Sequence, residues 1–153
     1  SSQLFAGVCR VPEISAMTLM YQKEVGEKTV LRPGVKNQMN SLLMLSSAFF
    51  ESRSITKVSP GAFLPPPKVD SIVVGYKRKE PLVPLSEFKE YEAFLRKLFS
   101  FKRKQIGTVL KSWPKGKDLA TKVEESGFDL RTRAEALGEE DVLRFYSNYQ
   151  SLP

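Results

Sequence analysis

The chain has 153 residues, of which 41% are hydrophobic and 27% are charged, as in folded proteins rather than disordered ones. Its 24 lysines and arginines outnumber 17 acids, and the net charge of +7 favours a polyanionic partner. The absence of histidine excludes histidine-based catalysis and His-ligated metal sites. The single cysteine, Cys9, excludes an internal disulfide and predicts a reducing, cytoplasmic compartment. No apolar run is long enough to predict a helix that crosses a membrane.

Hydrophobic spacing predicts an α/β arrangement in the first half of the chain. In chain order, we expect a helix over 1–10, a buried strand over 17–21, a short helix over 22–28, a helix over 37–50, and strands over 51–58 and 71–77. Three strands make a thin sheet, and the apolar 17–21 strand needs cover on both faces. The first half of this chain is therefore expected to be the latter part of a larger α/β domain.

Prolines are concentrated between residues 60 and 84 and separate the two halves. They are Pro60, Pro65, Pro66, Pro67, Pro81 and Pro84. The first four predict a stiff, extended connection between two strands rather than a tight hairpin. Beyond Pro84 the spacing is helical, and we expect a helix that breaks near Ser100, a second that ends at Pro114, and further helices over 117–126 and 139–149. The expected domains are an α/β piece over 1–80 and a helical piece over 85–153.

The positive charge is localised in the helical piece. From residue 96 to residue 117 the charged residues are Arg96, Lys97, Lys102, Arg103, Lys104, Lys111, Lys115 and Lys117, with no acid among them. An ordinary solvated helix face is one interpretation of this run. A surface that contacts RNA phosphates is the other, because such a surface requires clustered cations.

The segment 59–71, Ser-Pro-Gly-Ala-Phe-Leu-Pro-Pro-Pro-Lys-Val-Asp-Ser, is the most distinctive in the chain. Composition alone favours a proline-stiffened loop in which Phe63 fills a core position. The alternative places Phe63 on a rigid loop as a stacking platform for a base, with Lys68 beside it to meet a phosphate.

The same segment resembles the P-x-x-x-F-x-P-x-P-K-V-[DN]-S segment of the KsgA-type small-subunit rRNA adenine dimethyltransferases. Three further segments resemble that family in the same order: Leu19-Met20-Tyr21-Gln22-Lys23-Glu24-Val25, Phe99-Ser100-Phe101-Lys102-Arg103-Lys104-Gln105-Ile106, and Arg133-Ala134-Glu135-Ala136-Leu137. At positions 101 and 102 the chain has Phe and Lys, where the family often has a polar residue and Arg. A bidentate contact at position 102 is therefore not expected, whereas a point-charge contact with a phosphate is.

The resemblance implies a fold and a reaction. The fold is α/β plus α: the second half of a class I (Rossmann-like) methyltransferase sheet, followed by a small helical C-terminal domain. The reaction transfers methyl groups from S-adenosylmethionine to two adjacent adenines of small-subunit rRNA, with the target adenine extruded from its stack. In the family, the phenylalanine of the proline segment packs against the extruded base, and here that residue is Phe63.

The resemblance covers only the latter part of the family. The family's glycine-rich cofactor loop, its ribose-binding acid and its N-[LI]-[PA]-[YF] motif precede the matching segments, and none of them is in this chain. We therefore expect S-adenosylmethionine in the intact enzyme and no cofactor or metal on this chain alone, which by itself is expected to be inactive.

Two other functions stay open. One is a non-catalytic RNA-binding or ribosome-assembly module, and the other is a large-subunit rRNA methyltransferase of the macrolide-resistance type. The expected partner is small-subunit rRNA or the ribosomal subunit, and pairing of the exposed sheet edge with a second copy is a further option. The candidate RNA-contacting residues, besides Phe63, are Lys68, Lys102, Arg103, Lys104 and Lys111.

Overall fold

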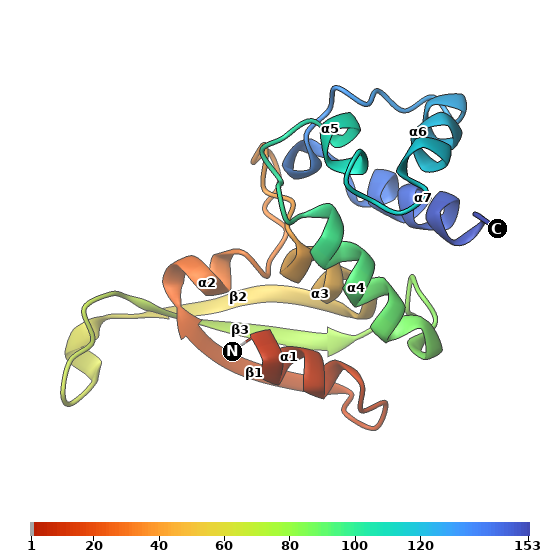
Figure 1. Cartoon of the computed structure of the whole chain (residues 1–153). Helices are drawn as coiled ribbons and strands as arrows, with labels where there is room; N and C mark the ends of the chain where they lie inside the picture. Colours follow the sequence, from red (N-terminus) through yellow and green to blue (C-terminus); the bar gives the residue numbers. More distant parts are fainter. Residues whose placement is uncertain (1) are drawn as a thin grey trace. The chain divides into compact units, whose positions relative to one another are not determined.

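The computed structural model describes residues 2–153, which divide into two compact units. The first unit comprises residues 2–33 and Leu45–Phe88, and the second comprises Gly34–Met44 and Lys89–Pro153. The helices and strands are α1 (Ser2–Cys9), β1 (Ala16–Gln22), α2 (Lys23–Glu27), α3 (Ser41–Phe49), β2 (Phe50–Val58), β3 (Ser71–Arg78), α4 (Phe88–Leu98), α5 (Ile106–Leu110), α6 (Gly116–Glu125) and α7 (Glu139–Gln150) (Figure 1). They confirm the predicted order of elements, including the break after the helix that precedes Ser100.

The sheet of the first unit has the strand order β1-β3-β2, and β3 is antiparallel to both neighbours. β1 and β2 therefore run parallel to each other. The carboxyl ends of both strands lie at the same end of the sheet, which we call its carboxyl edge. The pairing of β2 with β3 shifts between Ser54 and Thr56. This bulge explains why the 51–58 sequence alternates imperfectly, because an extra residue reverses the side-chain phase.

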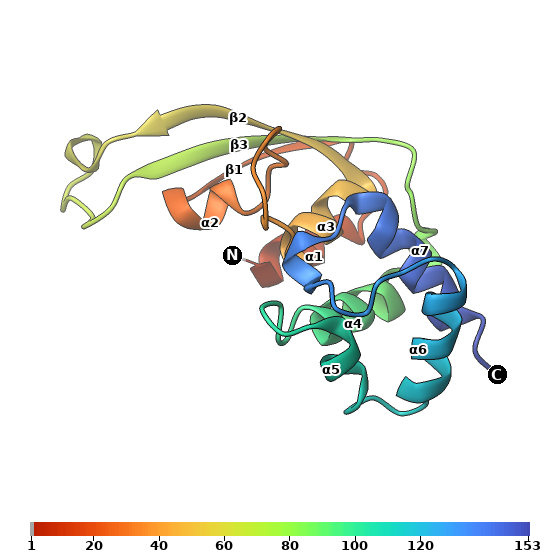
Figure 2. The ribbon, with the colours of Figure 1, turned by 90° about the horizontal axis from the view of Figure 1, so that it is seen from above.

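One face of the sheet is covered by α1 and α2, which both lie on the same side (Figure 2). The rings of Phe5, Phe50 and Tyr76 meet there, and the centroids of Phe5 and Tyr76 are 5.1 Å apart. Gly26 brings α2 close to the sheet, because a Cβ at this position would overlap the Cγ2 of Ile72. Cys9 is buried in this core.

A small polar cluster is buried between α2 and the sheet. The hydroxyl of Tyr76 lies 2.7 Å from the Oγ1 of Thr29 and 3.1 Å from the hydroxyl of Tyr21. Thr29 in turn donates a hydrogen bond to the carbonyl oxygen of Gly26. Burial raises the pKa of both tyrosines. The cluster fixes the end of α2 against the sheet.

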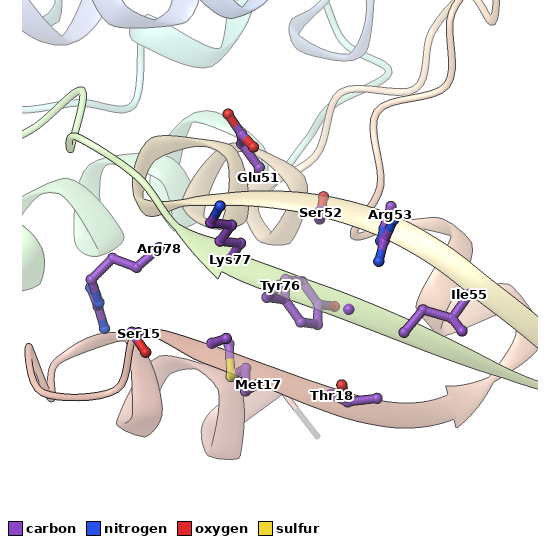
Figure 3. Close-up of a pocket in the computed structure, with 12 residues that line it drawn as sticks. Ser15, Met17, Thr18, Glu51, Ser52, Arg53, Ile55, Tyr76, Lys77 and Arg78 are labelled. Carbon is purple, nitrogen blue, oxygen red and sulfur yellow. The ribbon is translucent and has the colours of Figure 1, made fainter.

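The opposite face of the sheet is open, and the prediction that the 17–21 strand is buried was wrong. Only Tyr21 of that run is buried, and Met20 is 54% exposed. The side chains of successive strand residues point to opposite faces, and on this sheet only one face is covered within the first unit. A hollow of about 710 Å³ lies over the open face, with Thr18, Arg53 and Ile55 in its lining (Figure 3).

The helix expected over 37–50 begins later than predicted. Asn37 has a positive φ of 53°, and the side chain of Asn40 accepts a hydrogen bond from the backbone N–H of Leu43 at 3.0 Å. Asn40 therefore caps the N-terminus of α3, which begins at Ser41. Phe50, the last residue of the predicted helix, opens β2 instead.

The core of the second unit is an aromatic cluster. Phe94 is in ring contact with Trp113, Phe145 and Tyr149 at centroid distances of 5.4–6.0 Å. Trp113 is 6% exposed and packs in this core. These rings come from α4, α7 and the turn after α5, and they hold the helices together around one centre.

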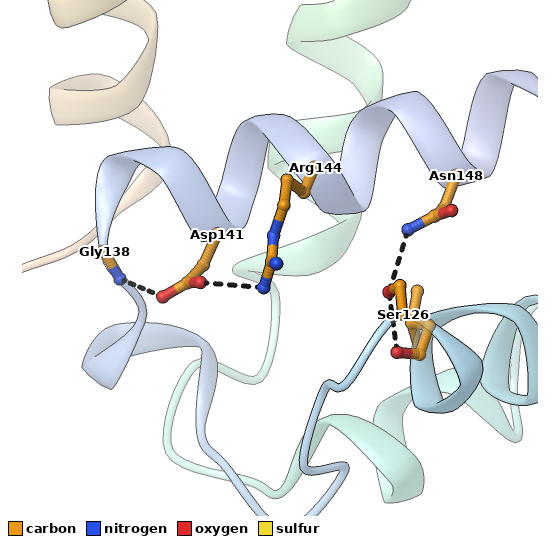
Figure 4. Close-up of polar contacts among 6 residues, drawn as sticks. Ser126, Gly138, Asp141, Arg144 and Asn148 are labelled. Atoms are coloured by element: carbon orange, nitrogen blue, oxygen red, sulfur yellow. Dashed lines mark hydrogen bonds and ion pairs between the residues drawn. The ribbon is translucent and has the colours of Figure 1, made fainter.

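The N-terminus of α7 shows how polar contacts fix this unit (Figure 4). The carboxylate of Asp141 accepts a hydrogen bond from the backbone N–H of Gly138 at 3.1 Å and pairs with Arg144. One turn further along, Asn148 donates to the hydroxyl of Ser126. The acidic first turn also complements the helix dipole.

Within residues 2–153, no helix is long and apolar enough to cross a membrane. The same residues bring together no group of three or more acidic or cysteine side chains suited to a metal ion.

Candidate functional site

The proline-rich segment forms a loop between β2 and β3 that extends well beyond the sheet (Figure 1). A 3-10 turn at Pro60–Ala62 opens the loop, and the backbone N–H of Phe63 donates to the carbonyl of Pro60 at 3.2 Å. Phe63 is only half-buried and is not part of the core, whereas its neighbour Leu64 is 99% exposed. Lys68 is exposed on the same loop.

This loop meets the segment that follows β1. Gln22 lies opposite Ser71 in the sheet, and the backbone N–H of Lys23 donates to the carbonyl of Asp70 at 2.9 Å. The loop also follows the carboxyl end of β2. In open α/β sheets, ligands bind outside the carboxyl ends of the parallel strands. Two of the distinctive sequence segments therefore lie side by side at the edge of the sheet where a substrate is expected.

The other two distinctive segments meet in the second unit. Gln105 and Arg133 form an isolated antiparallel bridge, and the backbone N–H of Glu135 donates to the carbonyl of Lys102 at 3.3 Å. The carboxylate of Glu135 also lies 4.0 Å from the ammonium of Lys102. The turn between α4 and α5 is thus tied to the segment before α7.

The four segments that carry the sequence resemblance are therefore arranged in two contacting pairs. A model of the ribosomal RNA adenine dimethylase family matches residues 1–151. The chain belongs to this family.

Curated members of the ribosomal RNA adenine dimethylase family are similar to most of the chain. Ribosomal RNA small subunit methyltransferase A of Clostridium botulinum strain Okra is 35% identical over 131 residues, which are 84% of this chain and 47% of that protein. The Thermotoga neapolitana protein of the same name is 36% identical over 129 residues, 84% of this chain and 45% of that protein. The chain spans about half the length of the curated relatives it matches.

Solved structures show that the fold is that of methyltransferases of this kind. A dimethyladenosine transferase from Plasmodium falciparum matches with a TM-score of 0.77 and 24% identity, over 98% of this chain and 64% of that one. The 23S rRNA methyltransferase ErmE matches with a TM-score of 0.64 and 22% identity, over 98% of this chain and 61% of that one. The sheet and helices of this chain are thus part of a Rossmann-like methyltransferase fold with a helical part, as predicted.

The predicted basic residues of the second unit fall into two groups. Lys102, Arg103 and Lys104 share the turn between α4 and α5, whereas Lys111 follows α5 and lines a separate groove. Arg103 and Lys104 are exposed, but Lys102 is partly buried beside Glu135. The turn therefore exposes Arg103 and Lys104 to solvent, whereas Lys102 is less exposed.

Sequence reasoning did not select Phe101, Lys117 or Arg131. Phe101 is 52% exposed, and the ammonium of Lys104 lies 4.6 Å from the centre of its ring. An aromatic residue directly before three cations is a signal that could have identified it. Lys117 and Arg131 line the same groove as Lys111, and only the fold brings them together.

The residues described here do not fit an S-adenosylmethionine site. The hollow over the open face of the sheet lies at the amino ends of β1 and β2, opposite the edge where a ligand of an α/β sheet binds. Its charged lining is mainly basic, with Arg53 and Lys77 beside Glu51 (Figure 3). The acid in this lining, Glu51, is at the amino end of β2 and lies opposite Lys77 in the sheet.

Proposed function

We propose that this chain supplies the latter part of an enzyme that transfers methyl groups from S-adenosylmethionine to two adjacent adenines of small-subunit rRNA. The observation that carries this proposal is the contact between the Lys23 and Asp70 segments at the carboxyl edge of the sheet. That contact holds the base of the Phe63 loop where a substrate is expected. The names of the curated relatives support the same substrate class.

In this proposal, Phe63 stacks on the extruded target adenine. A base inside a duplex or a stack cannot be reached by a methyl donor, so such enzymes take the target base out and hold it against aromatic side chains. The half-buried ring of Phe63, on a loop that extends beyond the sheet, is suited to this role. Lys68, exposed on the same loop, contacts a neighbouring phosphate.

The helical unit binds the surrounding rRNA. Its turn between α4 and α5 presents Arg103 and Lys104 to solvent, and Phe101 adds an exposed ring beside them. Cations contribute most of the affinity for RNA in a sequence-independent way, while an aromatic ring stacks on an unpaired base. Lys102 contributes less, because Glu135 partly neutralises it. In the sequence, residues 1–80 are the methyltransferase-like part of this proposal, and residues 85–153 are the rRNA-binding part.

S-adenosylmethionine supplies the methyl group in the intact enzyme, bound by residues outside this chain. The enzyme acts in the cytoplasm, where small ribosomal subunits are assembled. The outer edge of β1 has no strand partner within residues 2–153, and it is the surface through which two copies of this chain would associate.

The test is methyl transfer by the native protein purified from its source cells. The protein is incubated with radiolabelled S-adenosylmethionine and with either small or large ribosomal subunits that lack the modification. We expect label in small-subunit rRNA only, as dimethyladenosine at two adjacent positions. Label in large-subunit rRNA would overturn the proposal in favour of the resistance-type enzyme. RNA binding without transfer would overturn it in favour of a non-catalytic module.

A further inference from the structure

The second unit carries a groove between α5 and α6 that the proposed function does not use. Its volume is about 420 Å³, which lies in the range of small-molecule sites. The floor is apolar and includes Leu110, Ala120 and Leu130. The rim carries Lys111 and Lys117.

Close backbone packing forms the groove. Lys115 adopts a left-handed conformation with φ 56°, and a Cβ on Gly116 would overlap the carbonyl oxygen of Leu110. The backbone N–H of Gly107 donates to the carbonyl of Leu130 at 2.9 Å. The two glycines therefore let the backbone pack closely without side chains to fill the space above it. The backbone conformation itself therefore forms the groove.

The charges on the rim are not equivalent. The guanidinium of Arg131, which also lines the groove, makes two 3.1 Å contacts with the carboxylate of Asp129, and these hydrogen bonds lower the pKa of Asp129. Lys111 and Lys117 are both exposed, and neither ammonium has an ion-pair partner within residues 2–153. Two unneutralised cations thus stand beside an apolar floor.

We propose that this groove binds one unstacked nucleotide of single-stranded RNA. The base or ribose lies on the apolar floor, and the flanking phosphates meet Lys111 and Lys117. Contact of an extruded base with apolar side chains, combined with cations for the backbone, is one pattern by which proteins hold unpaired nucleotides. The charge of the rim favours a polyanion over a protein segment. This inference rests on the proposed function, because it takes RNA as the partner.

The test measures binding of a fluorescent single-stranded RNA to residues 1–153 by anisotropy. Two variants alter the groove: Ala120→Leu fills the floor without changing charge, and Lys111→Glu with Lys117→Glu reverses the rim. The matched control, Lys36→Glu with Lys89→Glu, makes the same charge change at exposed lysines of the same unit outside the groove. Circular dichroism establishes that each variant is folded.

We expect Ala120→Leu to weaken binding by about 4-fold or more, the equivalent of losing at least one buried CH₂-sized contact between the floor and the base. The rim variant should weaken binding more than its control does. The groove proposal fails if Ala120→Leu binds RNA as the unaltered chain does and the rim variant binds as its control does. If Arg103→Glu with Lys104→Glu still weakens binding in that case, the proposed function stands. If the unaltered chain binds no RNA, the groove proposal fails, and methyl transfer by the native protein decides the proposed function separately. Should Ala120→Leu not fold, the rim variant and its control decide alone.

Discussion

The ammonium of Lys102 lies 4.0 Å from the carboxylate of Glu135, whose side chain is only 14% exposed. This pairing separates Lys102 from its neighbour Arg103, which is exposed. The three cations of the turn between α4 and α5 are adjacent in sequence, yet they are not equally available to a phosphate.

We therefore expect Arg103→Gln and Lys102→Gln to affect RNA binding unequally. Each phosphate contact that is lost lowers the slope of log affinity against log salt concentration by about one. Arg103→Gln should lower the slope by that amount, and Lys102→Gln by less than half of it, because the lysine charge is already partly neutralised. Anisotropy titrations over a series of potassium chloride concentrations measure both slopes. Equal slopes for the two variants would contradict this assignment.

Phe63→Ala in the native enzyme should reduce methyl transfer far more than it reduces cofactor binding. Stacking of an aromatic ring on a base contributes about 1–3 kcal/mol, which corresponds to a loss of about 5- to 150-fold. Because Phe63 is outside the buried core, the melting temperature should change little. Leu64→Ala, at the adjacent and almost fully exposed position, is the control. Unchanged transfer per folded molecule would make Phe63 a structural residue.

Two buried tyrosines should respond in opposite ways to loss of the hydroxyl. Tyr76→Phe removes an oxygen that lies near both Thr29 and Tyr21, so it should lower the free energy of unfolding by about 1–2 kcal/mol. Within residues 2–153 the buried hydroxyl of Tyr91 has no hydrogen-bond partner, so Tyr91→Phe should be neutral or stabilising by up to about 1 kcal/mol. Urea denaturation followed by circular dichroism compares the two. A larger loss for Tyr91→Phe than for Tyr76→Phe would refute the predicted order.

Stability of the first unit should fall at alkaline pH. Burial raises the pKa of Tyr21 and of Tyr76 above the unfolded value of about 10. The unfolded state therefore loses its phenolic protons first as pH rises, and the stabilisation that is complete below about pH 10 is lost above it. The slope is at most about 1.4 kcal/mol per pH unit for each tyrosine. Urea unfolding at pH 8 and at pH 11 measures the loss, which should be smaller in Tyr21→Phe. An equal loss in this variant would exclude the tyrosine as the cause.

Hydrophobic spacing predicts the helices and strands of this fold well, because the spacing within each segment indicates whether that segment is helical or extended. The strand over 71–78 and the helices over 88–98 and 139–150 have regular spacing, and they form as expected. The start of α3 depends instead on a side-chain cap at Asn40, which spacing does not reveal. The exposure of Met20 depends on which face of the sheet is covered, a property of the assembled sheet rather than of the strand.

The candidate site was predictable only where its residues are adjacent in sequence. The loop around Phe63 and the turn around Arg103 are each one continuous segment, so the composition of that segment indicates a candidate site. The groove beside Lys117 was not predictable, because its lining comes from α5, α6 and the segment around Leu130. The same holds for the pairing of Glu135 with Lys102, which joins two segments far apart in the sequence.

The two outer edges of the sheet differ in charge, and this difference limits how copies of the chain can assemble. β2 carries Glu51, Arg53 and Lys57 and is bulged, whereas β1 has no charged side chain along its length. Charged and bulged edges resist further pairing, so the proposed association of two copies would form at the β1 edge. Two copies joined through β1 would have a two-fold arrangement with charged β2 at both ends. Such an assembly would be closed at two subunits and would not propagate into a fibre.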